Sequence, residues 1–136
     1  MKKVLIAEDQ VHIRRLIEQS IEELEDDGVE ILVVPDGIAA LSIILEERPD
    51  VVLLDVMMPG MNGFEVCEKL RNDTGARHAH VIFLTAKGQA YDRAKAREVG
   101  ADEYLMKPFD PDELLATVRR ALGFTDDWAS GDRVRS

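Results

Sequence analysis

The sequence predicts an α/β domain built on a parallel sheet. Two observations carry this prediction: short apolar runs alternate five times with stretches of helical spacing, and the chain has only 136 residues. Apolar runs of this length are typical of strands buried on both faces, and regular alternation with helices favours right-handed crossovers. An eight-stranded α/β barrel needs about 250 residues, so the length excludes that alternative.

The expected strands are apolar runs, most of them rich in β-branched residues. They cover residues 4–7, 31–34, 51–54, 81–84 and 104–106. Between the first two runs, apolar residues from Ile13 to Leu24 recur at offsets of three and four, which predicts one face of a helix. The second and third helices repeat this pattern more briefly, at Ile38, Leu41 and Leu45, and at Phe64, Cys67 and Leu70.

The last two expected helices differ in how much apolar surface they can bury. The segment 89–99 is rich in alanine and has a thin apolar face, which predicts the most easily displaced helix of the five. The final helix has apolar residues from Leu114 to Leu122, with Pro111 suited to its first turn and Gly123 to its C-terminal cap. We therefore expect one domain over residues 1–122 and a loose tail over 123–136.

Composition narrows the range of functions. Lys plus Arg number 17 and Asp plus Glu number 27, so the net charge is −10, which disfavours nucleic-acid binding by this chain. The single cysteine, Cys67, cannot form an intrachain disulfide and is compatible with a reducing compartment. No apolar run approaches the roughly 20 residues of a membrane span, so we expect a cytoplasmic protein without a membrane partner.

Compact polar residues follow four of the five expected strands. Glu8 and Asp9 follow the first, Asp55 the third, Thr85 the fourth and Lys107 the fifth. In an open parallel sheet these strand ends share one edge, where ligands collect. We therefore expect these side chains to converge, although they are remote in sequence.

Carboxylates held this close together need compensation for their repulsion. Raised pKa values would supply it, and so would Mg²⁺, which is commonly bound by carboxylates and water. Lys107 adds a compact positive charge that can hold an anion, and Thr85 adds a hydroxyl donor. Asp55 would then be the nucleophile that takes up a phosphoryl group as an aspartyl phosphate.

Several motifs follow one another along the chain: the acidic pair Glu8-Asp9, the strand 51–55 ending in Asp55, the loop 57–63, Leu84-Thr85-Ala86, and 104–109 with Lys107-Pro108. In this order they resemble the receiver domain of bacterial two-component response regulators, and the resemblance covers residues 2–122. The likeness is to stand-alone regulators of the chemotaxis type. It implies a flavodoxin-like, doubly wound sheet of five parallel strands in the order 2-1-3-4-5, flanked by five helices.

The resemblance also implies the roles of the site residues. Asp55 would accept phosphoryl from a histidine kinase or a phosphotransfer protein. Mg²⁺ would be held by Glu8, Asp9, Asp55 and the backbone carbonyl of Met57. The remaining implied residues are the phosphoryl-binding and switch group Thr85, Ala86, Lys107 and Tyr104, the cis-proline Pro108, and the pair that tunes dephosphorylation, Met57 and Lys87.

The resemblance further implies a signalling switch and not an enzyme. The face made by the fourth helix, fifth strand and fifth helix would change shape and regulate an unidentified downstream protein, as a monomer or a phosphorylation-dependent dimer. The phosphodonor would dock beside the first helix. The candidate output residues are Arg93, Lys95 and Arg97, and the candidate docking residues are Val11, Arg14, Arg15, Pro108 and Phe109.

Three other functions compete with this interpretation. A Mg²⁺-dependent phosphatase with an Asp nucleophile would need a second Asp two positions later, where this chain has Met57. A nucleotide-binding domain is unsupported because the chain contains neither G-x-x-x-x-G-K-[ST] nor G-x-G-x-x-G. A pseudo-receiver that serves only as a scaffold is disfavoured because every residue of the acceptor site is present.

Overall fold

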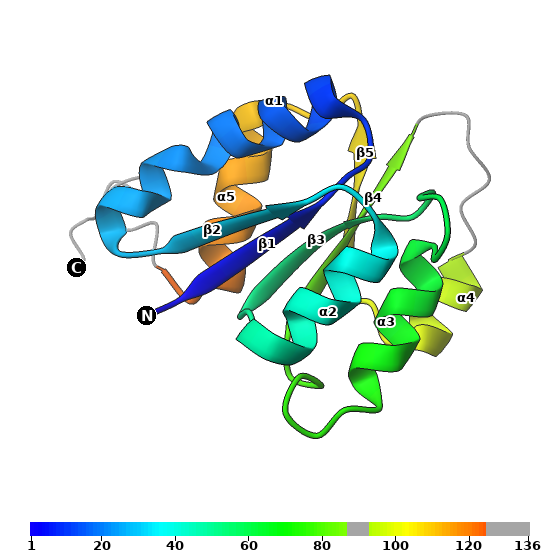
Figure 1. Ribbon diagram of the computed structural model, residues 1–136. Helices are drawn as coiled ribbons and strands as arrows, with labels where there is room; N and C mark the ends of the chain where they lie inside the picture. The colour runs from blue at the N-terminus through cyan, green and yellow to red at the C-terminus, as the bar shows by residue number, and fades with distance from the viewer. Residues whose placement is uncertain (87–92, 125–136) are drawn as a thin grey trace.

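A computed structural model describes residues 1–86 and 93–124 of the chain. Over these residues a parallel sheet has the strand order β2-β1-β3-β4-β5, which confirms the predicted fold class (Figure 1). The strands are β1 Lys3–Ala7, β2 Glu30–Val34, β3 Val51–Asp55, β4 His80–Ala86 and β5 Glu103–Lys107. The helices are α1 Val11–Ile21, the 3₁₀ helix η1 Glu22–Asp27, α2 Gly37–Glu47, α3 Gly63–Arg71, α4 Arg93–Val99 and α5 Pro111–Ala121.

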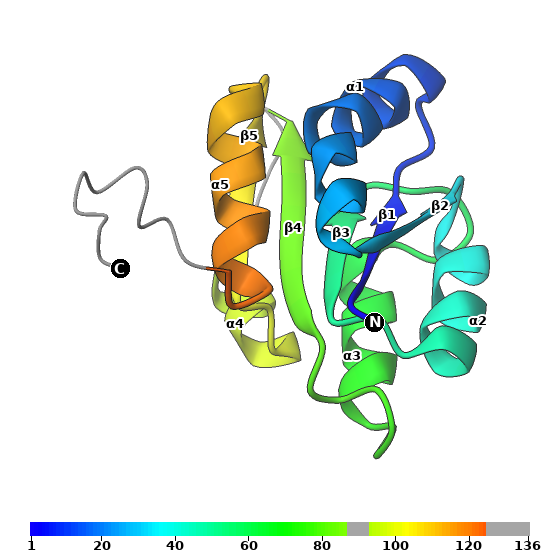
Figure 2. The same ribbon diagram turned by 90° about the vertical axis from the view of Figure 1, so that its left-hand side faces the viewer.

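Helices cover both faces of the sheet. Helices α1 and α5 pack on one face, and α2, α3 and α4 pack on the other (Figures 1 and 2). Successive residues of a strand point to opposite faces, so Leu5 joins the core under α2 and α3 while Ile6 joins the core under α1 and α5. Both cores exclude water from the sheet, which explains why the strands are continuous apolar runs. No helix in the described ranges is long and apolar enough to cross a membrane.

The first helix is shorter than its apolar pattern predicts. It ends at Ile21, and the acid-rich segment Glu22–Asp27 continues as a 3₁₀ turn that is stopped by Gly28 at φ 84°. Negative charges at a helix C-terminus oppose its dipole, which disfavours continuing the α-helix here. Leu24 remains fully buried, as are Ile17 and Ile21, whereas Leu16 of the same apolar pattern is 42% exposed.

The second helix has the predicted position, but its apolar spacing marks the outer face. The buried residues of α2 are Gly37, Ala40 and Ile44, whereas Ile38 is 61% exposed and Leu45 is 41% exposed. The small residues decide the orientation, because a Cβ on Gly37 would lie 1.9 Å from the Met61 carbonyl oxygen. The face of α2 that contains Gly37 therefore packs against the rest of the protein, and the face with Ile38 and Leu45 points to solvent.

The expected helix 89–99 and the expected tail 123–136 are each described only in part. The described part of α4 buries only Ala96 and Val99, consistent with the thin apolar face expected for 89–99. Residues 87–92 lie outside the described part of the chain. Phe124, expected in the tail, packs against the core under α1 and α5, and the remaining tail residues, 125–136, are likewise not described.

Candidate functional site

Four strands bring polar side chains to one edge of the sheet. Glu8 and Asp9 follow β1 directly, Asp55 ends β3, and Lys107 ends β5. The register pairs Asp55 with Leu84 and Ala86 with Lys107, so Thr85 lies between them on β4. The convergence predicted from the strand ends is therefore present in the structure.

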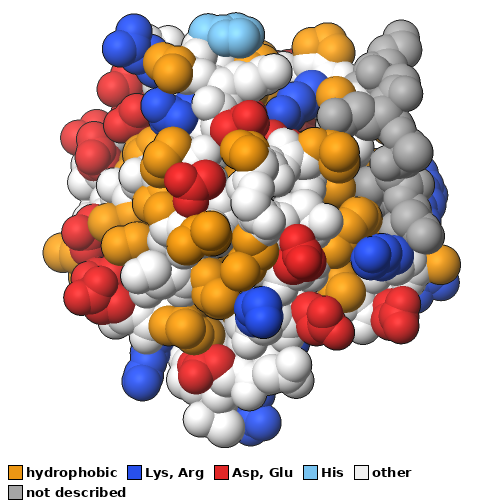
Figure 3. Space-filling model, turned by 45° about the vertical axis from the view of Figure 1, so that its right-hand side comes forward, with side chains coloured by type: hydrophobic (Ala, Val, Ile, Leu, Met, Phe, Trp, Pro, Cys, Tyr) orange, Lys and Arg blue, Asp and Glu red, His pale blue; other side chains and the backbone are white. Residues whose placement is uncertain are grey.

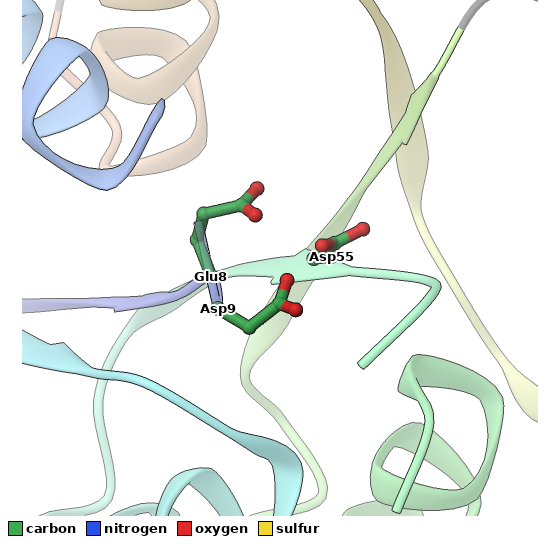
Figure 4. A group of neighbouring side chains, drawn as sticks. All are labelled: Glu8, Asp9 and Asp55. Carbon is green, nitrogen blue, oxygen red and sulfur yellow. The ribbon is translucent and has the colours of Figure 1, made fainter. Parts of the chain in front are cut away.

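Three carboxylates form the centre of this edge. Glu8, Asp9 and Asp55 each place one oxygen so that all three oxygens lie within 4.8 Å of one another (Figure 4). Glu8 is fully buried and Asp55 is 3% exposed, whereas Asp9 is exposed. The cluster therefore has two carboxylates below the surface and a third at its opening.

A single lysine lies between the two buried carboxylates. The Lys107 Nζ is 2.7 Å from Glu8 Oε1 and 3.6 Å from Asp55 Oδ2. Glu8 Oε2 also accepts a hydrogen bond from the Gln10 backbone N–H at 3.2 Å. Among the residues that the structure describes, Lys107 supplies the one ammonium group paired with three carboxylates, so this part of the cluster has an excess of negative charge.

Burial and the neighbouring negative charge together change the acidity of Asp55. Burial first, and then the nearby charge of Glu8, raise the pKa of Asp55 to about 7, and Lys107 opposes the rise. The Met57 backbone N–H donates to Asp55 Oδ1 at 3.1 Å, which orients the carboxylate and leaves Oδ2 on the side of Lys107. Asp55 is thus a buried, oriented and electrostatically destabilised carboxylate.

The donor set fits a hard divalent cation. Carboxylate oxygens are the ligands that Mg²⁺ prefers, and a cation would relieve the repulsion that raises the pKa of Asp55. The exposed Asp9 leaves an open side through which bound water or an anion could be reached. Glu8, Asp9 and Asp55 are the residues that could hold such an ion.

The residues expected to act as a switch lie on β4 and β5 in different environments. Thr85 is 1% exposed, whereas Tyr104 is half-buried on the neighbouring strand. The Arg93 guanidinium donates a hydrogen bond to the Tyr104 hydroxyl and lies 4.9 Å from the centre of its ring. The peptide bond between Lys107 and Pro108 is cis.

Of the two residues expected to tune dephosphorylation, the structure describes only Met57. The Met57 side chain is 54% exposed, and Lys87 lies outside the described residues. Sequence reasoning missed two contacts. The Arg14 guanidinium donates a hydrogen bond to the Glu8 backbone carbonyl at 2.9 Å, and the Lys107 ammonium donates one to Glu8 Oε1 at 2.7 Å. The place of Arg14, one turn into the helix that follows the acidic pair, could have indicated the first contact.

Known proteins with a similar sequence belong to one family. Residues 4–119 match the family model of the response regulator receiver domain. The DNA-binding response regulator MtrA of Mycobacterium tuberculosis is 43% identical over 126 residues, which are 93% of this chain and 53% of that protein. The chain thus spans about half the length of the curated relatives it matches.

Solved structures show the same likeness. The chemotaxis response regulator CheY4 of Vibrio cholerae is 34% identical with a TM-score of 0.77, covering 89% of this chain and 98% of that one. The receiver domain of sensor histidine kinase PA1611 from Pseudomonas aeruginosa is 30% identical with a TM-score of 0.78, covering 90% and 98%. Its structure has a magnesium ion coordinated in the active site cleft. This chain belongs to the response regulator receiver domain family of two-component signalling proteins.

Proposed function

We propose that this chain is a signalling switch in which Asp55 accepts a phosphoryl group from a histidine kinase or a phosphotransfer protein. The observation that supports this most strongly is the cluster of Glu8, Asp9 and Asp55 with Lys107 at its side. Family membership supports phosphorylation-based signalling in general. The identity of the acceptor and the role of each neighbour are our proposal.

The chain's own residues account for the transfer. An Asp55 carboxylate oxygen forms a bond to phosphorus while the phosphorus–nitrogen bond of a phosphohistidine breaks and its imidazole leaves. Lys107 moves from Glu8 to the new phosphoryl oxygens, and the Thr85 hydroxyl donates to them. Mg²⁺, held by Glu8, Asp9, Asp55 and the Met57 carbonyl, would neutralise the charge of the transferred group.

The output follows from what surrounds Tyr104. Phosphorylation adds about −1.5 to −2 charge and three acceptor oxygens, which draw Thr85 toward Asp55 and free space behind it. Tyr104 fills that space and leaves Arg93, so the α4–β5–α5 face changes shape. Arg93 and Arg97 line a cavity of about 230 Å³ on this face, and with Lys95 they are the candidate contacts for a downstream protein.

The phosphodonor would dock on the neighbouring side of the site. Val11 is 50% exposed at the start of α1, close in sequence to Asp9. Arg14 and Arg15 follow on the same helix, and Pro108 and Phe109 follow Lys107. This surface joins apolar contact area to positive charge directly beside the acceptor.

A DNA-directed output is the second candidate, and one observation favours it. MtrA is named a DNA-binding response regulator, and this chain spans about half of that protein. The net charge of −10 disfavours DNA binding by this chain, so such an activity would need residues beyond these 136. Phosphorylation-dependent dimerisation of the receiver domain would then be the step that controls DNA binding.

Intact-mass measurement after incubation with Mg²⁺ and acetyl phosphate tests the acceptor. The wild-type chain should gain one phosphoryl group and Asp55→Asn none, while Asp26→Asn, which alters an exposed aspartate, should label as the wild type does. Labelling of Asp55→Asn would reject Asp55 as the acceptor. Consumption of acetyl phosphate without a stable adduct would favour the phosphatase alternative.

The exposed Met57 side chain predicts a long-lived phosphorylated form. Its thioether is a poor hydrogen-bond partner for an attacking water, so Met57→Asn should shorten the lifetime of the adduct several-fold. Loss of the adduct can be followed by mass after the phosphodonor is removed. Equal lifetimes in the two proteins would contradict this role of Met57.

A further inference from the structure

The outer face of α2 is apolar although it faces solvent. Ile38, Leu41 and Leu45 recur at offsets of three and four and form one stripe along the helix. Ile38 is 61% exposed, Leu45 is 41% exposed and Leu41 is half-buried. Figure 3 shows hydrophobic side chains gathered over this helix on the left of the view. A contiguous apolar surface of this kind marks an interaction site more often than isolated exposed residues do.

This stripe is separate from the phosphorylation site and its output face. Helix α2 contacts β1 and α3, and α3 lies between it and α4. Because β2 and β5 are at opposite ends of the sheet, the stripe and the α4–β5–α5 face lie on different sides of the molecule (Figure 1). A partner on α2 would therefore leave Asp55 and the output face accessible.

The charges around the stripe are acidic. Asp36 caps the N-terminus of α2, and the exposed Glu46 directly follows Leu45. Glu47 at the end of α2 is paired with Lys3, whose Nζ lies 2.6 Å from Glu47 Oε1, so this pair adds little net charge to the margin. Arg48, at the C-cap of α2, turns its guanidinium toward Gly75: a Cβ on Gly75 would lie 2.7 Å from Arg48 Cζ. Figure 3 shows Asp and Glu side chains along the margin of the same apolar area.

These charges select among the possible occupants. A second copy would bring the same acidic margin and a net charge of −10 to the interface, and an anionic lipid surface would be repelled in the same way. A segment with apolar residues at helical spacing and Lys or Arg at its margins matches both the stripe and its rim. We propose that the outer face of α2 docks a basic amphipathic helix of another protein.

The test uses a synthetic amphipathic helix with leucines on one face and lysines along both margins. Amide NMR spectra of the labelled protein should show shifts concentrated in residues 37–47 on addition of this peptide. A peptide with the same leucines but with glutamates in place of the lysines should leave the spectra unchanged. Shifts concentrated elsewhere, or equal effects of the two peptides, would overturn the proposal.

A matched pair of variants locates the contact. Leu45→Ser, and more strongly Ile38→Ser with Leu45→Ser, should weaken peptide binding at least tenfold. Leu16→Ser should not, since Leu16 on α1 is 42% exposed and Leu45 is 41% exposed. If Leu16→Ser weakened peptide binding as much as Leu45→Ser does, the assignment of the contact to α2 would be overturned. Self-association of the free protein that is abolished by Leu45→Ser would also overturn the proposal, because that result would make a second copy the occupant.

The same experiment separates this inference from the proposed function. Asp55→Asn should bind the lysine peptide as tightly as the wild type, because α2 docking does not require phosphorylation. The Leu45→Ser variant should still gain one phosphoryl group from acetyl phosphate. Peptide binding that is lost in Asp55→Asn would overturn the independence of the two surfaces.

Discussion

The two edges of the sheet both collect charged side chains, but they differ in how these side chains are paired. At the amino edge, where β1, β4 and β5 begin, the Arg71 guanidinium is 2.8 Å from Asp102 and His80 is 2.6 Å from Glu103. At the carboxyl edge, as far as the described residues go, three carboxylates share the ammonium of Lys107. The paired side chains of the amino edge stabilise the fold, and the excess charge of the carboxyl edge is what we propose attracts a cation and a phosphoryl group.

Removing Arg71 tests the amino edge and carries the largest expected effect. Its guanidinium donates to the carbonyls of Gly100, Ala79 and Arg77 as well as to Asp102. Arg71→Met leaves these acceptors without their donor, so we expect the free energy of unfolding to fall by about 3 kcal/mol. Chemical denaturation measures this, with Lys69→Met on the exposed side of the same helix as control. Equal stability of both variants would show that the amino edge does not stabilise the fold.

The pH dependence of stability tests the carboxyl edge. Burial raises the pKa of Asp55 from its ordinary value of 3.8 to about 7, so between these values the folded state binds more protons than the unfolded state. The free energy of unfolding should therefore fall as the pH rises from 4 to 7 in EDTA, on the order of 2 kcal/mol from this residue. Asp55→Asn should lack that part of the slope. Identical slopes in the two proteins would contradict the destabilised carboxylate.

Substitution of Glu103 should have the smallest effect. Its side chain and that of His80 are each about a third exposed, at 37% and 30%, so solvent screens their interaction. Glu103→Gln removes the charge and keeps an oxygen that can accept from the ring, which predicts a loss below about 1 kcal/mol in chemical denaturation. A loss as large as that of Arg71→Met would show that the amino edge depends on this pair.

The sequence allowed most of the fold and the centre of the site to be predicted. Apolar runs identified every strand to within a few residues; the expected strand 51–54, for example, is Val51–Asp55 in the structure. Strand ends identified the cluster because parallel topology forces them to one edge. Both predictions depend on periodicity, which a single sequence contains.

The rest depends on contacts between segments remote in sequence. The apolar spacing of α2 defined a face, but only the approach of Gly37 to Met61 decides that the other face packs inward. The Arg71 network joins α3 to loops at residues 77–79 and 100–102, which no local pattern connects. The pairing of Lys107 with Glu8 spans 99 residues and needs the sheet order to be known.

Magnesium should reverse the destabilisation caused by the crowded carboxylates of the carboxyl edge, and measuring the free energy of unfolding with and without the ion is the most direct test of the account. At pH 8 without Mg²⁺, Asp55→Asn should be more stable than the wild type in chemical denaturation, because it removes one of the crowded charges. With saturating Mg²⁺ the wild type should gain stability and overtake the variant, since only its cluster binds the ion fully. A less stable Asp55→Asn without the ion, or equal gains in both proteins, would contradict a carboxyl edge organised for cation binding.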